Sequence, residues 1–248
     1  MLDLGTGDGR VLGMLRRVSP QLELIGVDLA RTLPEPPEGT STQGGVPMES
    51  LPFEDDSFTA VTAQFAVEYG DVTRIAPEIA RVSQDGALVG LITHRDDGPI
   101  LAHNVQRREA IRWAIDEEKL IEVARKSLAL RYFGLHGAAP GIARAPAEGA
   151  RRFGPRSAAW EIAEAIRQTV EMGARSDPAV VAATLGQIET QARNELGRID
   201  SLERACGTFA DEQAVEGVFA ESGLELIETR DLFEADGPPF AHFRLLRA

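Results

Sequence analysis

Three glycines and an aspartate near the N-terminus have the types and spacing that suit the binding of a small polar ligand. The chain begins MLDLGTGDG, so Gly5, Gly7 and Gly9 follow a short apolar run that contains Asp3. Glycines at such a turn adopt backbone angles that other residues avoid, and they let a ligand approach the backbone closely. Asp3 lies two residues before the first glycine, where its carboxylate could accept hydrogen bonds from an ammonium group.

A second acid completes the pattern. Asp28 follows Gly9 at close to the ~20 residues expected for a carboxylate that accepts from both hydroxyls of a ribose. The alternative interpretation is an acid that only caps a turn between a strand and a helix. Together the residues indicate recognition of a nucleoside-containing ligand by hydrogen bonds and charge.

The elements that position these residues are a strand, a tight turn and a helix. Leu2 and Leu4 predict the first strand, and apolar residues at helical spacing within 11–18 predict the helix that follows. Residues 22–27 predict a second strand that ends at Asp28. In a parallel sheet, ligands bind beyond the carboxyl ends of the strands, which is where the glycine turn and Asp28 are expected.

The glycine turn by itself is compatible with nicotinamide, flavin and adenosyl-sulfonium cofactors. The sixth position of the dinucleotide fingerprint is normally Gly or Ala, and here it is Arg10. The most specific stretch in the chain is MESLPFEDDSFTAV, from Met48 to Val61. It resembles the segment AExLPFxDxSFDxV of the type 11 methyltransferase domain. The first turn likewise resembles the motif (D/E)xGxGxG of class I S-adenosylmethionine-dependent methyltransferases.

The resemblance implies S-adenosyl-L-methionine as the cofactor. The residues expected to bind it are Asp3, Gly5, Thr6, Gly7, Gly9, Asp28, Met48, Glu49 and Gln64. The family often has an acid two residues before the glutamate, in contact with the adenine amino group, but Pro47 stands there in this chain. Recognition of adenine is therefore expected to depend on backbone near Met48 and on Glu49.

Residues that follow the fourth and fifth predicted strands are expected near the transferred methyl group. They are Gln64, Phe65, Glu68 and Tyr69 after the fourth strand, and His94 after the fifth. His94 is the candidate general base for an acceptor that must lose a proton, the alternative being a structural hydrogen-bonding role. His103 and His136 lie in or near the segment expected to meet the substrate. No histidine lies at metal-ligand spacing from Cys, Asp or Glu, so no metal site is expected.

The predicted fold class is α/β, a doubly wound, mostly parallel seven-stranded sheet of the Rossmann-like methyltransferase kind, with a helical insert between strands 5 and 6. Residues 1–94 and 207–248 are expected to form the S-adenosylmethionine-binding core, and residues 95–206 the insert. Further strands are expected at 40–44, 60–66, 87–93, 224–232 and 240–246, the last antiparallel to the rest. Helices are expected at 71–82, with a break or kink at Pro77, and at 211–222.

Two segments depart from the family pattern. Three prolines within 31–39 predict an irregular connection where the family has a helix. In the insert, three stripes of apolar residues predict helices, and a link containing glycine and proline is expected at 134–155. The insert is expected to cover the substrate, and the alternative is a dimerisation or purely structural role.

Composition limits the partners and the compartment. The formal net charge of −13 argues against a nucleic-acid partner. The single cysteine, Cys206, allows no intramolecular disulfide and indicates a reducing compartment. No apolar run approaches the ~20 residues that span a bilayer, and the N-terminus lacks a signal-peptide pattern. A cytoplasmic protein with a small-molecule substrate is expected, without a membrane partner, and a homodimer through the insert is a further expectation. Because family members usually carry tens of residues before the first strand, we expect a cleft without that cover or a start upstream of Met1.

Three functions are compatible with these features. The first is transfer of a methyl group from S-adenosylmethionine to a small-molecule acceptor by in-line displacement, in which the protein aligns the acceptor and excludes water. The second is nicotinamide-dependent oxidoreduction on a related fold, against which Arg10 and the LPFEDDSF segment argue. The third is a non-catalytic interaction protein with a decayed cofactor pocket, which Pro47 and the prolines of 31–39 favour. The fold serves oxygen, nitrogen, carbon and sulfur acceptors, so the acceptor atom stays open.

Overall fold

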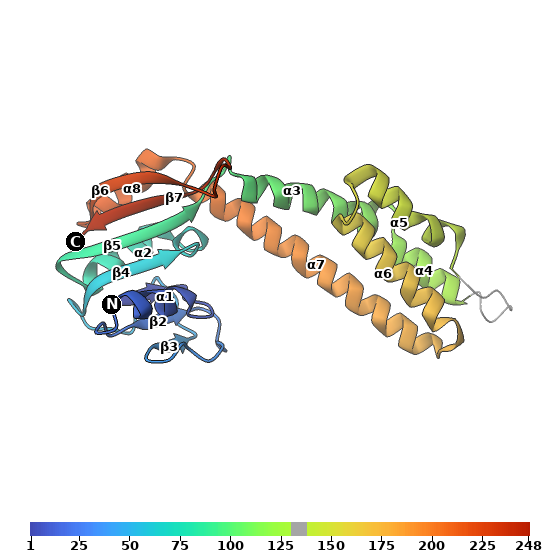
Figure 1. The fold of residues 1–248 in the computed structure, drawn as a ribbon, viewed down its shortest axis with the longest axis horizontal. Coiled ribbons are helices and arrows are strands. Elements are labelled where there is room, and N and C mark those ends of the chain that lie inside the picture. The colour runs from blue at the N-terminus through green and yellow to red at the C-terminus, as the bar shows by residue number, and fades with distance from the viewer. Residues whose placement is uncertain (130–137) are drawn as a thin grey trace. The chain divides into compact units, whose positions relative to one another are not determined.

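The computed structural model describes residues 1–129 and 138–248, which form two compact units. The core unit comprises Met1–Leu101 and Leu202–Ala248, and the helical unit comprises Ala102–Ser201 (Figure 1). Residues 95–101 and 202–206, expected in the insert, are therefore part of the core unit. Among the described residues, no helix is both long enough and apolar enough to cross a membrane.

One seven-stranded sheet organises the core unit, in the order β3-β2-β1-β4-β5-β7-β6. Its strands are β1 (Leu2–Leu4), β2 (Ile25–Asp28), β3 (Ser41–Gly44), β4 (Phe58–Gln64), β5 (Ser83–His94), β6 (Glu225–Phe233) and β7 (Pro239–Arg247). β1 to β5 pair in parallel, whereas β7 pairs antiparallel with both β5 and β6. The predicted fold class, a mostly parallel sheet with an antiparallel last strand, is confirmed.

The largest differences from the predicted strands concern β2, β5 and β6. β2 begins at Ile25 rather than at residue 22, and β5 begins at Ser83, before the predicted start at residue 87. The alternating pattern of 224–232 predicts a half-buried strand, but most residues of β6 are exposed. β6 lies at the edge of the sheet, where less of the core covers a strand.

The helices of the core unit are α1 (Arg10–Val18), η1 (Val67–Tyr69), α2 (Val72–Val82) and α8 (Glu212–Glu221). The side chain of Asp71 accepts a hydrogen bond from the backbone N–H of Thr73 and so caps α2, and Asp211 caps α8 in the same way. Of the break or kink predicted at Pro77, the break does not occur, because α2 continues through this residue. Proline removes one helical hydrogen bond, and the burial of the neighbouring Ala76 and Ile79 in the core holds the helix together.

The proline-rich connection packs against the first helix. Residues 31–39 contain no helix, as predicted. A Cβ atom added to Gly9 would lie 2.7 Å from Cδ of Pro37, and one added to Gly13 would lie 3.2 Å from its Cγ. Pro37 therefore occupies the space that the glycines leave at the start of α1.

The LPFEDDSF segment is fixed by one arginine. Arg81, near the end of α2, donates to the carbonyl oxygens of Leu51 and Phe53 at 3.1 and 2.8 Å. Its guanidinium also pairs with Asp55 and Glu78, both at 2.8 Å. These contacts hold the turn that leads into β4 and, with it, the residues that follow β4 at the ligand-binding edge.

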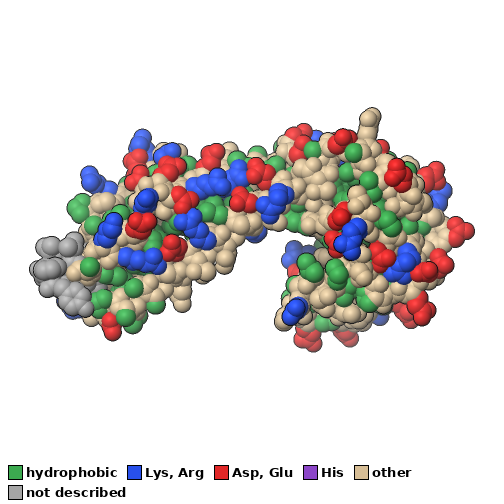
Figure 2. All heavy atoms as spheres, turned by 180° about the vertical axis from the view of Figure 1, so that it is seen from behind, with side chains coloured by type: hydrophobic (Ala, Val, Ile, Leu, Met, Phe, Trp, Pro, Cys, Tyr) green, Lys and Arg blue, Asp and Glu red, His purple; other side chains and the backbone are tan. Residues whose placement is uncertain are grey.

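The helical unit contains the remaining helices. They are α3 (Pro99–Arg112), which begins in the core unit, η2 (Trp113–Glu117), α4 (Leu120–Ala129), α5 (Pro140–Phe153), α6 (Ala158–Met172), η4 (Gly173–Arg175) and α7 (Pro178–Thr208), which ends in the core unit. Buried apolar residues from these helices form their own cluster around Trp113, Ile142 and Ile166. Acidic and basic side chains are interspersed over this unit (Figure 2).

The link expected at 134–155 is wrong over most of its described length, because α5 occupies Pro140–Phe153. Pro140 is at the first turn, where its missing N–H costs nothing, and Gly149 lets α5 approach α6 closely. A Cβ atom at Gly149 would lie 3.0 Å from both the backbone of Ala159 and the ring of Trp113. Glycine predicts a break when the sequence is considered alone, but Gly149 is required in α5 by the packing of its neighbours. Residues 134–137, which include His136, lie outside the described residues.

Candidate active site

The glycine turn after β1 has the backbone conformation that its sequence predicts. Gly5, Gly7 and Gly9 all have positive φ angles, of 64°, 55° and 71°. At Gly5 a Cβ atom would lie 2.4 Å from Cβ of Ala66, so the backbone after β4 approaches this turn directly. At Gly7 a Cβ atom would meet nothing within 4 Å, so the backbone here is open to a ligand. Gly9 must be a glycine because a Cβ atom at this position would collide with the ring of Pro37.

Asp28 connects the glycine turn to the end of β2. Its Oδ2 accepts from the backbone N–H of Gly7 at 2.9 Å, and its Oδ1 accepts from that of Ala30 at 2.8 Å. A carboxylate has about four acceptor positions, so this one holds the turn and retains capacity for two hydroxyl donors. The structural and the ligand-binding interpretations of Asp28 are therefore compatible.

Asp3 is a buried carboxylate in the middle of β1. Only 1% of the residue is exposed, and its Oδ1 accepts from the hydroxyl of Thr62 at 2.8 Å. Burial raises the pKa of Asp3 to about 6, which the hydrogen bond from Thr62 opposes and the nearby charge of Asp28 reinforces. A cationic ligand group beside Asp3 would relieve the cost of ionising it.

Replacement of Asp3 by asparagine is expected to remove a specific pH dependence of stability. The pKa of Asp3 is about 6 in the folded protein and about 3.9 in an unfolded chain. Between these values the folded state holds a proton that the unfolded state has released. The free energy of unfolding of the wild type therefore falls as pH rises from about 4 to 6, by up to about 3 kcal/mol from this residue.

Urea unfolding at about pH 4.5 and about pH 7 measures this contribution. Asp3→Asn should gain stability relative to the wild type at the higher pH, whereas Asp8→Asn, at an exposed carboxylate in the same turn, should not. Equal pH dependence in the wild type and Asp3→Asn would contradict the assignment.

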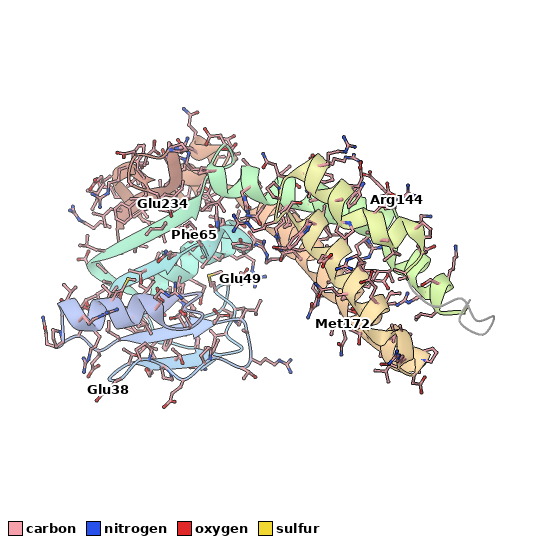
Figure 3. All side chains as sticks on the ribbon, turned by 45° about the vertical axis from the view of Figure 1, so that its right-hand side comes forward. Glu38, Glu49, Phe65, Arg144, Met172 and Glu234 are labelled. Carbon is pink, nitrogen blue, oxygen red and sulfur yellow. The ribbon has the colours of Figure 1, made fainter. Side chains whose placement is uncertain are left out.

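Gly5 and Phe65 line two cavities. The first, of about 200 Å³, is lined by residues that include Asp3, Gly5, Thr6 and Gln64. The second, of about 270 Å³, is lined by residues that include Gly5, Asp28, Met48, Glu49 and Tyr69. Phe65 lines both cavities, and Figure 3 labels it with Glu49 in the core unit. All the expected cofactor-binding residues except Gly7 and Gly9 line one or the other.

Phe65 stands out as a residue with a strained backbone at this edge. Its φ angle is 54°, in the left-handed region that non-glycine residues avoid. Its N–H donates to the carbonyl of Ile92 in β5 at 2.7 Å, and its ring stacks on the imidazole of His94 with centroids 4.1 Å apart. Strain of this kind persists where the surrounding structure fixes it, and it is frequent at functional sites.

Glu68 and His94 form a buried pair behind Phe65. Nδ1 of His94 lies 2.8 Å from Oε1 of Glu68, and the backbone N–H of His94 donates to the same oxygen at 3.1 Å. Glu68 is 2% exposed, so its carboxylate contacts His94 and does not face the cavities. The ring of Tyr69 meets His94 edge-on, with centroids 6.1 Å apart.

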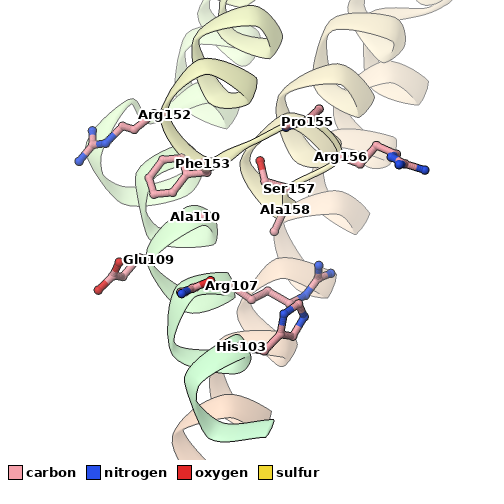
Figure 4. A pocket seen from close by; sticks show the side chains of 11 residues that line it. His103, Arg107, Glu109, Ala110, Arg152, Phe153, Pro155, Arg156, Ser157 and Ala158 are labelled. Carbon is pink, nitrogen blue, oxygen red and sulfur yellow. The ribbon is translucent and has the colours of Figure 1, made fainter. Parts of the chain in front are cut away.

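His103 lies in the other unit. With Arg107 and Phe153 it lines a cavity of about 470 Å³ whose lining residues all belong to the helical unit (Figure 4).

Cys206 is buried near the end of α7, where burial raises the pKa of its thiol to about 11. Within 1–129 and 138–248 no cluster of His, Cys, Asp and Glu side chains could hold a metal ion.

Sequence reasoning missed the pairing of Glu68 with His94 and the left-handed backbone of Phe65. The only signal for the first was the position of both residues after adjacent strands. Leu29, Pro47, Ala66 and Gly70 also line the second cavity, and their place beside motif residues was the available clue.

Comparison with known proteins agrees with this geometry. Residues 2–90 match the family model described as a methyltransferase domain. The chain is 32% identical over 123 residues to the uncharacterized methyltransferase YcgJ of Bacillus subtilis, covering 45% of this chain and 47% of that protein. It is 36% identical over 94 residues to demethylmenaquinone methyltransferase of Thermotoga maritima, covering 36% of this chain and 41% of that protein. The chain thus spans less than half the length of these curated relatives.

Among solved structures, an S-adenosylmethionine-dependent methyltransferase of Mesorhizobium loti aligns over 100% of this chain and 90% of its own length, with 14% identity and a TM-score of 0.47. Residues 2–90, which contain the glycine-turn site, are thus similar to a methyltransferase domain of the class I S-adenosylmethionine-dependent type. The cofactor of that class is S-adenosylmethionine.

Proposed function

We propose that this protein transfers a methyl group from S-adenosylmethionine to a small-molecule acceptor. The observation that supports the proposal is the pair of cavities that share Gly5 and Phe65 and are lined by residues of the sequence motifs. One cavity contains the buried carboxylate of Asp3, and the other contains Asp28 and the segment 47–49.

The residues fit the chemical parts of the cofactor. Asp3 suits the ammonium group, because a cation beside a buried carboxylate replaces the hydration that it has lost. The open backbone at Gly7 and the carboxylate of Asp28 suit the ribose. Met48 and Glu49 line the end of the second cavity expected for adenine, with Pro47 in place of the family's acid.

When bound, S-adenosylmethionine supplies an activated methyl group, so the protein does not need to activate the donor. The contribution of this chain is to hold the acceptor in line with the methyl group and to exclude water. Phe65 and Tyr69 supply apolar surface for that purpose at the cavities. For the helical unit, we keep the expectation of a role in acceptor recognition, which its cavity beside His103 supports. A cytoplasmic location and a homodimer through this unit are predictions of the sequence.

Calorimetric titration of the purified chain with S-adenosylhomocysteine and, separately, with NADH tests the proposal. Binding of S-adenosylhomocysteine with micromolar affinity, about −8 kcal/mol, and none of NADH is the expected result. Binding of NADH alone would favour the oxidoreductase, and binding of neither by this chain or by an N-terminally extended one would favour the non-catalytic interaction protein.

A further inference from the structure

The cavity of the helical unit has a basic lining, although the chain as a whole is acidic. α3 forms one side of this cavity, and the end of α5 with the turn before α6 forms the other (Figure 4). Its lining includes the three arginines Arg107, Arg152 and Arg156 and one acid, Glu109. The whole chain has the opposite balance, with 26 basic and 39 acidic residues. A local excess of cations attracts anionic ligands.

Arg156 occupies a backbone position that favours glycine. The N–H of Ser157 donates to the carbonyl of Gly154 at 3.3 Å, so residues 154–157 form a four-residue turn. Pro155 is the second residue of this turn, and Arg156, the third, has a φ angle of 64°. A turn with proline second and a positive φ third is of type II, in which the third residue is usually Gly or Asn. The arginine therefore introduces backbone strain that a glycine would avoid.

The strained turn brings a guanidinium without a carboxylate partner to the cavity. Arg156 lines the cavity, and within the described residues it pairs with no acid. By contrast, Arg107 pairs with Glu195 at 3.0 Å, and Arg152 pairs with Glu117 at 3.2 Å. Strain of this kind is frequent where the strained residue has a function. An unpaired cation at such a position indicates that the function is the binding of an anion.

An aromatic ring lies among these cations. Phe153 is half-buried, its ring packs on Trp113 with centroids 5.8 Å apart, and Cζ of Arg152 lies 5.1 Å from its centroid. Ala110 and Ala158, both buried, add apolar surface to the cavity. The volume of about 470 Å³ falls within the range of ~300–1,000 Å³ that is typical of small-molecule sites. The lining therefore suits a ligand that has an apolar part and an anionic group.

We propose that this cavity binds a small organic anion, whose carboxylate or phosphate group is held by Arg156 and whose apolar part contacts Phe153. A guanidinium binds either oxyanion through paired, charge-assisted hydrogen bonds. Arg107 and Arg152 add positive charge and keep further N–H donors, because a guanidinium has five. The site goes beyond the proposed methyl transfer and does not depend on it, since all its lining residues belong to the helical unit.

Proton NMR of the full chain measures binding through the imidazole signals of His103, which lines the cavity and which His103→Gln identifies. The probes are phenyl phosphate and benzoate. The controls are inorganic phosphate, which lacks the apolar part, and benzyl alcohol, which lacks the charge. At low ionic strength, where exposed charges are little screened, each probe should shift these signals saturably and bind about fivefold or more tighter than either control.

Arg156→Gly distinguishes a role in binding from a role in structure. It should weaken binding of phenyl phosphate by about tenfold or more, the effect of losing a hydrogen bond to a charged group. It should also raise the midpoint of thermal unfolding by about 2–4 °C, because it relieves the strain of the turn. Arg151→Gln, at an exposed arginine outside the cavity lining, should change the affinity by less than about twofold.

Unmoved His103 signals in the presence of both probes would overturn the site. Affinity for benzyl alcohol equal to that for the probes would overturn the anionic class, and equal affinity for inorganic phosphate would overturn the apolar contact. Unchanged binding by Arg156→Gly, an equal loss in Arg151→Gln, or a lower unfolding midpoint of Arg156→Gly would overturn the role of Arg156. If S-adenosylhomocysteine fails to bind the wild type, the proposed methyl transfer fails, whereas these measurements still decide the anion site.

Discussion

Asp28→Ala is expected to weaken binding of S-adenosylhomocysteine by about 100-fold or more, the loss of two charge-assisted hydrogen bonds of about 1.5–3 kcal/mol each. The carboxylate holds the N–H groups of Gly7 and Ala30 and retains acceptor positions for the two ribose hydroxyls. The substitution would remove the proposed ribose contacts and would also leave the glycine turn without the hydrogen bond from Gly7 to Asp28. Calorimetric titration against the wild type measures the loss.

Asp8→Ala is the matched control for this prediction. Asp8 lies in the same turn and is an aspartate too, but it is about half exposed and pairs with Arg10 at the surface. It should change the affinity by less than about threefold, since exposed ion pairs contribute at most about 1 kcal/mol. An affinity of Asp28→Ala within threefold of the wild type would leave Asp28 as a turn cap alone.

Gly5→Ala is expected to destabilise the core unit by about 2–5 kcal/mol, combining left-handed backbone strain of about 1–2 kcal/mol with overpacking of about 1–3 kcal/mol. The added Cβ atom would lie 2.4 Å from Cβ of Ala66, at a φ angle of 64°. The turn after β1 and the segment after β4 must then separate, which also displaces Phe65. Urea unfolding measures the stability, and S-adenosylhomocysteine titration measures the displacement.

Two further variants separate strain from overpacking. Gly7→Ala has a similar φ angle but open space around its Cβ position, so it should cost only the strain. In Gly5→Ala/Ala66→Gly the colliding atom is removed, and part of the stability lost in Gly5→Ala should return. Equal destabilisation by Gly5→Ala and Gly7→Ala, with no recovery in the double variant, would show that the close approach to Ala66 has no energetic effect.

The sequence predicted the parts of the site that depend on local chain geometry. Asp3, the glycine turn and Asp28 belong to one strand–turn–helix–strand unit, in which spacing along the chain determines position in space. The irregular connection at 31–39 was equally predictable, because the prolines there exclude a helix whatever surrounds them.

Features that depend on contacts between distant residues were not predictable. Glu68 meets His94 because β4 and β5 pair in the register that places Gln64 opposite Ile92, and nothing in either segment specifies that register. The glycines and prolines of 134–155 predict a link where the structure has α5, and within this helix Gly149 is required by the packing of Trp113 and Ala159 against it.

The place of the helical unit in the chain has a consequence for how the protein folds during synthesis. β5 cannot pair with its antiparallel partner β7 until the ribosome has synthesised Ala102–Ser201. Until then, the edge of β5 that pairs with β7 stays exposed. The helical unit reduces the length of flexible chain between β5 and β7. In this unit Arg107 pairs with Glu195 and Arg108 with Asp200, so the first and last helices of the unit lie together. Once this unit has folded, fewer disordered residues separate β5 from β7, which lowers the entropic cost of closing the loop by roughly 1 kcal/mol.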